Sequence, residues 1–174
     1  MTWFSVSRYY QQMSDYWYKL YAGTRPPRRL FELVTVDVAT EIYPLIQYTL
    51  GQTVFDQGNV KCLSGQYKAT TIDELMRFVQ WARVHKLRYT PIFRDCPDFA
   101  LALAGKFPQT DWYGSPVGMI NVMQGGQWHV MDIAFAYPNA ENQTLALHII
   151  EPQDGVIVPT ARVAGQPIDL ILMP

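Results

Sequence analysis

The spacing of apolar residues changes near Ser115, and this change restricts the folds that the chain can adopt. Upstream, apolar residues recur at three- and four-residue steps, as in amphipathic helices, whereas downstream they alternate with polar residues, as in strands. The pair Gly125-Gly126 predicts a tight hairpin between the first two strands. The predicted strands cover residues 117–123, 127–137, 144–152 and 168–172, with a short strand after Asp154-Gly155. Helices followed by an antiparallel sheet indicate an α+β fold.

The helical half begins with an aromatic stripe. Its members recur at helical spacing within residues 7–21 and are Tyr9, Met13, Tyr16, Trp17, Leu20 and Tyr21. This stripe is expected to pack on the domain, and a docking surface for a protein partner is the alternative. The segments that follow are a predicted strand over 30–36, a helix over 40–50 and a loop over 52–70. The capping-box pair Thr71 and Glu74 then opens another helix.

The length of 174 residues suits one domain. We divide it into an N-terminal helical region, residues 1–86, and a core, residues 87–174, that carries the candidate site. The N-terminal region is expected to pack on the same domain as the core. The core is expected to combine the helix that carries the nucleophile with the antiparallel sheet.

Charge and hydropathy exclude several kinds of partner. A net charge of −1 without a long basic run argues against nucleic acid. Arg25, Arg28 and Arg29 flank Pro26-Pro27, and such a short basic turn is expected to be solvated surface. No apolar stretch approaches the roughly 20 residues of a membrane span, and no targeting segment is visible. No membrane partner is therefore expected, and the predicted location is cytoplasmic.

The two cysteines, Cys62 and Cys96, are too few for a disulfide framework, so both are expected to be free thiols. Pro97 is favoured at the first position of a helix, which places Cys96 at or beside the N-cap. Unpaired N–H groups and the helix dipole favour a thiolate at such a position. Cys96 is therefore a candidate nucleophile, with an inert buried cysteine as the alternative.

His129 and Glu151 are candidates for the base and for the group that orients it, as a cysteine hydrolase requires. Alternation places His129 on the strand face of Met131, and Glu151 on the face of Ile149. A buried glutamate is rare unless it is paired. If the turn between their strands spans residues 138–142, His129 lies directly opposite Glu151, with Cβ atoms roughly 4.5–5.5 Å apart. A shift of two residues would keep both side chains on this face and separate them.

Three segments carry a family resemblance: Asp95-Cys96-Pro97-Asp98-Phe99-Ala100, His129-Val130-Met131-Asp132 and Ile150-Glu151-Pro152-Gln153-Asp154-Gly155. Together they resemble a group of phage proteins and the C-terminal domain of fungal chimerolectins. The resemblance implies a papain-like or transglutaminase-like fold, with N-terminal helices packed on an antiparallel sheet. It also implies that Cys96 is the nucleophile of a thiol protease, His129 its general base and Glu151 the orienting group. A phage or viral protein of this kind would lie in the host cytoplasm or the virion.

The chain departs from the family pattern at Pro97, where an acidic residue is usual, and at Val130, which replaces a small alanine. The resemblance implies calcium dependence, because fungal members of the group are calcium-dependent proteases. Asp95, Asp98 and Asp154 carry oxygen atoms of the kind that Ca²⁺ binds, but helix caps and turns are the alternative. Pro97 removes one possible ligand, so no metal or other cofactor is assigned.

Further residues are expected near the site. Tyr89 precedes the nucleophile and Gln153 follows Glu151, so both are candidates for substrate or oxyanion binding. An ordinary strand aromatic and a turn residue are the alternatives. Trp112 and Tyr113 precede the sheet and are candidates for lining a substrate groove.

Two functions therefore compete. The first is a thiol hydrolase, a peptidase or amidase, that acts on a peptide or amide substrate through an acyl-enzyme on Cys96. The second is a non-catalytic viral structural or interaction protein that retains the fold, because a fold and a motif do not guarantee activity.

Overall fold

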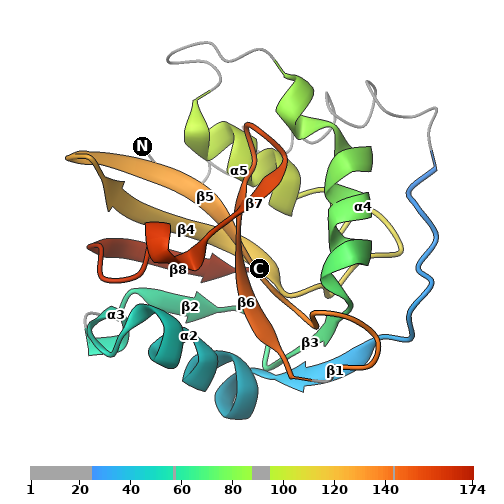
Figure 1. The fold of residues 1–174 in the computed structure, drawn as a ribbon, viewed down its shortest axis with the longest axis horizontal. Coiled ribbons are helices and arrows are strands. Elements are labelled where there is room, and N and C mark those ends of the chain that lie inside the picture. Colours follow the sequence, from blue (N-terminus) through green and yellow to red (C-terminus); the bar gives the residue numbers. More distant parts are fainter. Residues whose placement is uncertain (1–24, 57, 88–94, 143) are drawn as a thin grey trace.

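The computed structural model describes residues 25–56, 58–87, 95–142 and 144–174, and these form two sheets and several short helices (Figure 1). The strands are β1 (Val34–Asp37), β2 (Val60–Cys62), β3 (Gln66–Ala69), β4 (Val117–Gln124), β5 (Gln127–Ala136), β6 (Ala146–Glu151), β7 (Val156–Val158) and β8 (Ile168–Met173). The helices are η1 (Val38–Ile42), α2 (Tyr43–Leu50), α3 (Thr53–Asp56), α4 (Ile72–Ala82), η2 (Val84–Lys86), α5 (Cys96–Ala104) and η3 (Thr160–Arg162). The α+β class is therefore confirmed.

The larger sheet has the strand order β2-β8-β4-β5-β6-β7, and the smaller sheet pairs β1 with β3. All neighbours in the larger sheet are antiparallel except β2 and β8. The predicted hairpin is confirmed, because β4 and β5 pair across Gly125-Gly126, with His129 opposite Val122. Both glycines have positive φ, 55° and 82°, as a tight two-residue turn requires.

The prediction of a loop over residues 52–70 is wrong, because this segment contains α3, β2 and β3. Strand β2 pairs in parallel with β8, with Val60 beside Ile171. Strand β3 pairs with β1, with Tyr67 beside Val36. These strands are too short to show a clear alternation, and their partners lie elsewhere in the chain. The predicted strand over 30–36 is observed as β1, which begins later in the sequence than predicted.

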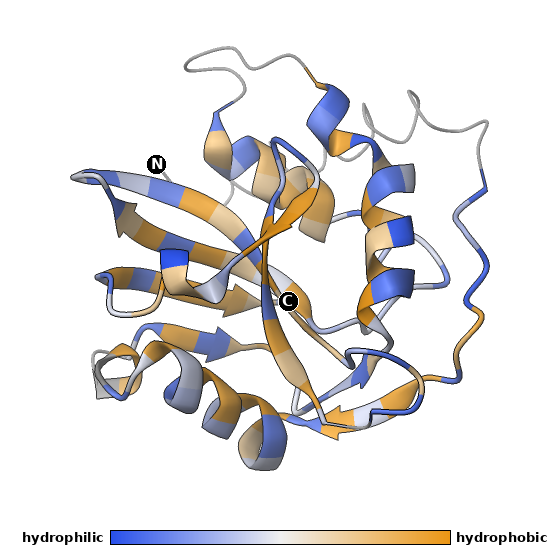
Figure 2. Cartoon of the chain, in the orientation of Figure 1, coloured by the Kyte–Doolittle hydropathy of each residue, from blue (hydrophilic) through white to orange (hydrophobic). Residues whose placement is uncertain are grey.

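Two apolar clusters lie on opposite faces of the larger sheet. On one face, Ile133 and Ile149 pack with α2 and the smaller sheet. On the other face, Ala134 and Ile150 pack with α4 and α5. Figure 2 shows the hydrophilic residues of α4 on its outer side, away from this cluster. Alternate residues of each central strand therefore serve different clusters, as the period of two requires.

Elements from both sides of residue 86 share one sheet and one core. Strand β2 lies at the edge of the larger sheet, and Tyr67 of β3 is 2% exposed in the same cluster as Met131. The region over 1–86 therefore contributes strands as well as helices. The aromatic stripe over 7–21 and the predicted extended segment over 88–93 lie outside the described residues. In the part of the chain that the structure describes, no helix has the length and apolar character needed to cross a bilayer.

Candidate functional site

Cys96 is the first residue of α5, as the sequence predicted. Asp95 is the N-cap, and its backbone N–H donates to Oδ2 of Asp98 at 3.4 Å. Pro97 occupies the first turn, where its missing N–H costs no hydrogen bond. The thiol therefore lies at the positive end of the helix dipole, and Asp98 serves as a capping residue.

The Cys96 thiol also lies against the exposed edge of β5. Strand β5 pairs with β6 only over Asp132–Ala136, so its earlier residues extend past the end of β6. At this edge, the backbone N–H of Val130 donates to Sγ of Cys96 at 3.5 Å. If β6 continued along this edge, one of its carbonyl groups would accept the hydrogen bond from Val130. Here the Cys96 thiol accepts it instead.

The imidazole of His129 lies between the Cys96 thiol and the Glu151 carboxylate. Its Nε2 lies 2.7 Å from Oε2 of Glu151, and the Cys96 thiol lies near enough to the ring to raise its pKa. Because Glu151 occupies Nε2, Nδ1 is the ring nitrogen left for the thiol. The His129 side chain is 23% exposed and that of Glu151 only 7%, so the carboxylate is the more deeply buried of the two groups.

The predicted contact between His129 and Glu151 is confirmed, but the predicted register is wrong. Ile133 pairs with Ile149 and not with Leu147, so β6 is shifted by two residues from the expected alignment. The connection between the strands spans residues 137–145, which is longer than the predicted turn over 138–142. Because the shift is by two residues, Glu151 stays on the expected face of the sheet. Its side chain contacts that of His129 from a diagonal position and not from the position directly opposite.

Neighbouring backbone holds Glu151 in place. The N–H of Gln153 donates to Oε1 at 3.3 Å, so the two carboxylate oxygens have different partners. The turn that follows is closed by a bond from Gly155 N–H to the Glu151 carbonyl, 2.8 Å, and Gln80 Nε2 donates to the Gly155 carbonyl at 2.7 Å. Gly155 has a φ of +66°, and an added Cβ would lie 2.6 Å from Nδ1 of His85. Helix α4 and η2 therefore support the turn that positions the carboxylate.

The electrostatics of the site favour a charged imidazole. The hydrogen bond with Cys96, and next that with Glu151, raise the pKa of His129 from 6.5 to about 9. Burial acts in the opposite direction but does not cancel these partners. Near neutral pH the ring is therefore an imidazolium, which stabilises an adjacent thiolate.

A second carboxyl group, Asp132, lies close by and is fully buried. Burial, and next the negative charge of Glu151, raise the pKa of Asp132 well above its usual range. Neither carboxyl oxygen has a hydrogen-bond partner among the described residues. The surroundings of Asp132 therefore favour its neutral form.

The remaining candidates have different outcomes. Tyr89 lies outside the described residues. Gln153 reaches the site through its backbone N–H, and a contribution of its side chain stays a prediction. Trp112 is 1% exposed and packs on Phe78 and Phe107, so its proposed place in a substrate groove is wrong. Tyr113 is exposed.

Sequence reasoning missed the Val130 N–H and the burial of Asp132. A backbone donor carries no sequence signal. Asp132 did carry one, because alternation places it on the apolar strand face of Ala134 and Ala136. The described residues contain no group of three or more His, Cys, Asp or Glu side chains that would hold a metal ion. Asp154 is exposed in the turn after β6.

Comparisons with known proteins place the fold but not the activity. No protein-family model matches the chain, and no curated protein matches it. Among solved structures, it is similar to PSL1a, a fungal lectin, solved as a PSL1a–E64 complex, with a TM-score of 0.62 and 16% identity. It is also similar to Polyporus squamosus lectin bound to the human-type influenza-binding epitope Neu5Acα2-6Galβ1-4GlcNAc, with a TM-score of 0.58 and 15% identity.

Each match covers 80% of this chain but only 50% and 49%, respectively, of the lectin chain. This chain therefore spans about half the length of the proteins that it matches. At such identities the likeness shows a shared fold.

These comparisons correct one expectation. The sequence led us to class the relatives of this chain as hydrolases, namely cysteine or thiol proteases, and as phage and viral proteins. That classification of its relatives is wrong, because both structural neighbours are chains of a fungal carbohydrate-binding lectin. The relation shown is to a fungal lectin chain in its fold.

Proposed function

We propose that the chain is a thiol hydrolase that cleaves an amide-type bond through an acyl intermediate on Cys96. The observation that supports this best is the series formed by the Cys96 thiol, the neighbouring imidazole of His129 and the buried Glu151, whose carboxylate lies 2.7 Å from the ring. Such a series supplies a nucleophile, a base and a group that orients the base. The non-catalytic interaction protein remains the alternative.

In the proposed reaction, the Cys96 thiolate attacks the carbonyl carbon, and the carbonyl π electrons move to the oxygen. The positive end of α5 lies beside this developing negative charge. The imidazolium of His129 then gives its proton to the leaving nitrogen as the carbon–nitrogen bond breaks, and a thioester remains. Neutral His129 next removes a proton from water, which attacks the thioester. The acid product leaves, and the proton on His129 restores the ion pair with the thiolate.

In this scheme, Glu151 keeps Nε2 of His129 protonated and leaves Nδ1 facing the sulfur. Its burial, together with the second bond from Gln153 N–H, limits other positions of the carboxylate. The buried groups thus orient the ring, and the partly exposed ring carries the proton.

The finer family relation is also part of the proposal. We infer a papain-like arrangement related to one half of the fungal lectin chain, consistent with the C-terminal domain that the motifs resemble. The PSL1a neighbour was solved as a complex with E64, which supports a test with the same compound on this chain. The glycan bound by the second neighbour is not transferred, because the likeness shows the fold alone.

The proposal predicts selective labelling of Cys96. At pH 6, iodoacetamide and E64 should modify Cys96 at least about tenfold faster than Cys62, as measured by peptide mass spectrometry. Cys62 is an internal control, because burial raises the pKa of its thiol. His129→Ala should slow labelling of Cys96 about tenfold or more and leave Cys62 unchanged. Glu151→Gln should have a smaller effect in the same direction.

Hydrolysis needs its own measurement. The full chain should release a fluorophore from at least one member of an amide-linked peptide library, and Cys96→Ser should abolish the release. If Cys96 is accessible but reacts no faster than Cys62, and His129→Ala changes nothing, the hydrolase proposal fails. Selective labelling without hydrolysis of any library member would instead favour the interaction protein with a reactive thiol.

A further inference from the structure

Helix α4 and the short helix η2 that follows it lie against two separate parts of the candidate site. On one side, η2 packs against α5, the helix that begins at Cys96. On the other side, Gln80 of α4 and His85 of η2 lie against Gly155, in the turn that follows Glu151. One continuous segment of the chain therefore contacts both the helix of the nucleophile and the turn beside the carboxylate.

The first half of α4 is fixed by an extended segment over residues 25–31. Arg77 Nη2 donates to the Arg28 carbonyl at 3.1 Å. The backbone N–H of Phe31 donates to Oε1 of Glu74 at 2.9 Å. Because α4 is held at this end by a distant part of the chain, it gives the turn after β6 a firm support at its other end.

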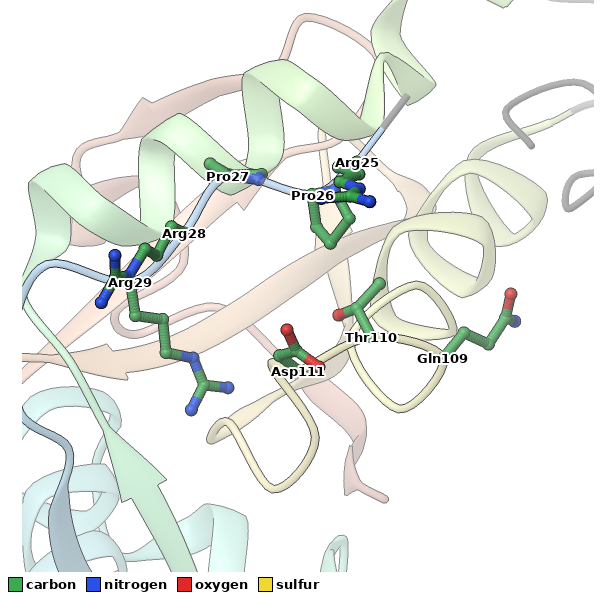
Figure 3. A pocket seen from close by; sticks show the side chains of 8 residues that line it. All are labelled: Arg25, Pro26, Pro27, Arg28, Arg29, Gln109, Thr110 and Asp111. Carbon is green, nitrogen blue, oxygen red and sulfur yellow. The ribbon is translucent and has the colours of Figure 1, made fainter. Parts of the chain in front are cut away.

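The start of this segment, residues 25–29, lies beside the loop over residues 109–111, and the two line a pocket (Figure 3). Trp112 Nε1 donates to the Pro27 carbonyl at 3.0 Å, and the guanidinium carbon of Arg29 lies 4.9 Å from the ring centroid of Trp112. The segment is thus a docked part of the domain, and the expectation of a solvated basic turn is wrong for Arg29.

The turn that follows Glu151 needs a support from outside because it ends in a glycine. Gly155 has a φ of +66°, and a residue without a Cβ can adopt several other backbone conformations at little cost. The Glu151 carbonyl accepts from Gly155 N–H at 2.8 Å and from Asp154 N–H at 3.3 Å. Gln80 Nε2 donates to the Gly155 carbonyl at 2.7 Å, so both polar backbone groups of this glycine are paired.

The conformation of this turn determines one of the two contacts of the Glu151 carboxylate. Its Oε1 accepts from the backbone N–H of Gln153, a residue of the turn, at 3.3 Å. Its Oε2 lies 2.7 Å from Nε2 of His129. A change in the turn would move the Gln153 N–H away from Oε1, and the carboxylate would lose a restraint on its orientation toward the imidazole.

The position of Gln80 on its helix separates this contact from the packing of the core. Gln80 is exposed, whereas Phe78 and Val79 beside it are buried. A carbonyl oxygen only accepts, so only a side chain with a donor at this reach can bond the Gly155 carbonyl. The hydrogen bond to the turn is therefore the specific contribution of Gln80, and a substitution can remove it without opening the core.

We propose that Gln80 is a positioning residue of the candidate site and acts on the carboxylate of Glu151 through the turn after β6. This inference rests on the proposed thiol function and adds a residue that the sequence did not single out. The hydrogen bond of Gln80 keeps the Gln153 N–H beside Oε1, so that Oε2 stays on His129. Loss of this bond weakens the support that Glu151 gives to the imidazolium, and with it the thiolate of Cys96.

Nuclear magnetic resonance of the full chain measures the effect on the imidazole. The Cε1–H signal of His129, identified by its absence in His129→Ala, is followed as the pH is raised. Gln80→Met keeps the length of the side chain and removes the donor, so the midpoint of the titration should fall by about 0.5 pH or more. Gln166→Met, the matched control, makes the same change at another exposed position and should leave the midpoint where it is in the parent chain.

Alkylation of Cys96 by iodoacetamide at pH 6 is the second readout. Gln80→Met should slow it about threefold, less than His129→Ala does, and the urea midpoint of unfolding should stay close to that of the parent chain. In the Glu151→Gln background, Gln80→Met should change neither the titration nor the alkylation further, because Gln80 acts through that carboxylate.

An unchanged His129 midpoint in Gln80→Met would overturn the proposal. Equal effects of Gln80→Met in the parent chain and in Glu151→Gln would also overturn it, because the residue would then act by a route other than Glu151. If Cys96 of the parent chain shows no selective labelling, the hydrolase proposal fails, whereas the His129 titration still decides whether Gln80 positions the carboxylate.

Discussion

The imidazole of His129 lies between a thiol and a carboxylate, and this placement determines its charge. The hydrogen bond with Cys96 and that with Glu151 both favour the protonated ring, whereas burial disfavours it. The opposite happens at Asp132, where burial without a partner favours the neutral acid. Among the described residues, Glu151 pairs with an imidazole and a backbone N–H, whereas Asp132 on the neighbouring strand is buried without a partner.

The raised pKa of His129 predicts how stability depends on pH. The folded protein holds this proton more tightly than the unfolded chain, so the stabilisation is complete below about pH 6.5 and is lost as the pH rises through about 9. The contribution that disappears is at most about 3 kcal/mol. Urea unfolding of the parent chain and of His129→Ala between pH 6 and pH 9.5 measures it. The difference between the two proteins should shrink with pH, and a constant difference would contradict the assignment.

At the scale of the elements, β4 and β8 approach each other unusually closely at Gly118. A Cβ at this position would lie 2.2 Å from the Leu172 carbonyl oxygen and 2.7 Å from Sδ of Met173. A glycine inside a strand often marks such an approach of two backbones. The close fit matters for the site, because β4 is the strand on which β5, with His129, is aligned.

Gly118→Ala should therefore force β4 and β8 apart and lower the free energy of unfolding by about 1–3 kcal/mol, as overpacking does. Gly65→Ala is the matched control, since a Cβ there has open space and the backbone has no positive φ. That control should stay within about 0.5 kcal/mol of the parent chain. Thermal and urea unfolding measure both variants, and equal stability of the two would show that the approach at Gly118 is less tight than the structure indicates.

For the whole molecule, the edge strand β2 ties the first half of the chain to its last strand. Asn59 adds to this tie, because its Nδ2 donates to the Ile168 carbonyl at 2.7 Å and its own carbonyl accepts from Ile171 N–H at 2.7 Å. The boundary that we drew at residue 86 therefore crosses a shared sheet and a shared apolar cluster. Units that share a core unfold together in most single domains of this size.

Native-state hydrogen exchange should show one cooperative unit across that boundary. Peptides that cover β2 and peptides that cover β5 should exchange through global unfolding with the same dependence on urea, measured by mass spectrometry. The exposed tip of the β4–β5 hairpin should exchange faster and serves as the control for local opening. A β2 region that exchanges at much lower urea than β5 would show that residues before 86 form a separate unit.

Local sequence patterns were enough to predict which residues face the core and where the helix of the nucleophile begins. Alternation identified β4, β5 and β6, and Gly125-Gly126 identified the hairpin, because a two-residue turn fixes the pairing of the strands that it joins. Pro97 after Cys96 placed the thiol at the start of α5. The same alternation placed His129 and Glu151 on one face, since facing depends only on the parity of positions along each strand.

The register of β6 and the pairing of β2, in contrast, are set by contacts between distant parts of the chain. A period of two fixes the face but not a shift by two residues, and the connection over residues 137–145 is too long for its turn geometry to set the register. Strand β2 is three residues long and acquires its partner from the C-terminus, so no local signal reveals it. The hydrogen bond that the Val130 N–H donates to Cys96 likewise depends on where β6 ends and where α5 packs, which local periodicity does not encode.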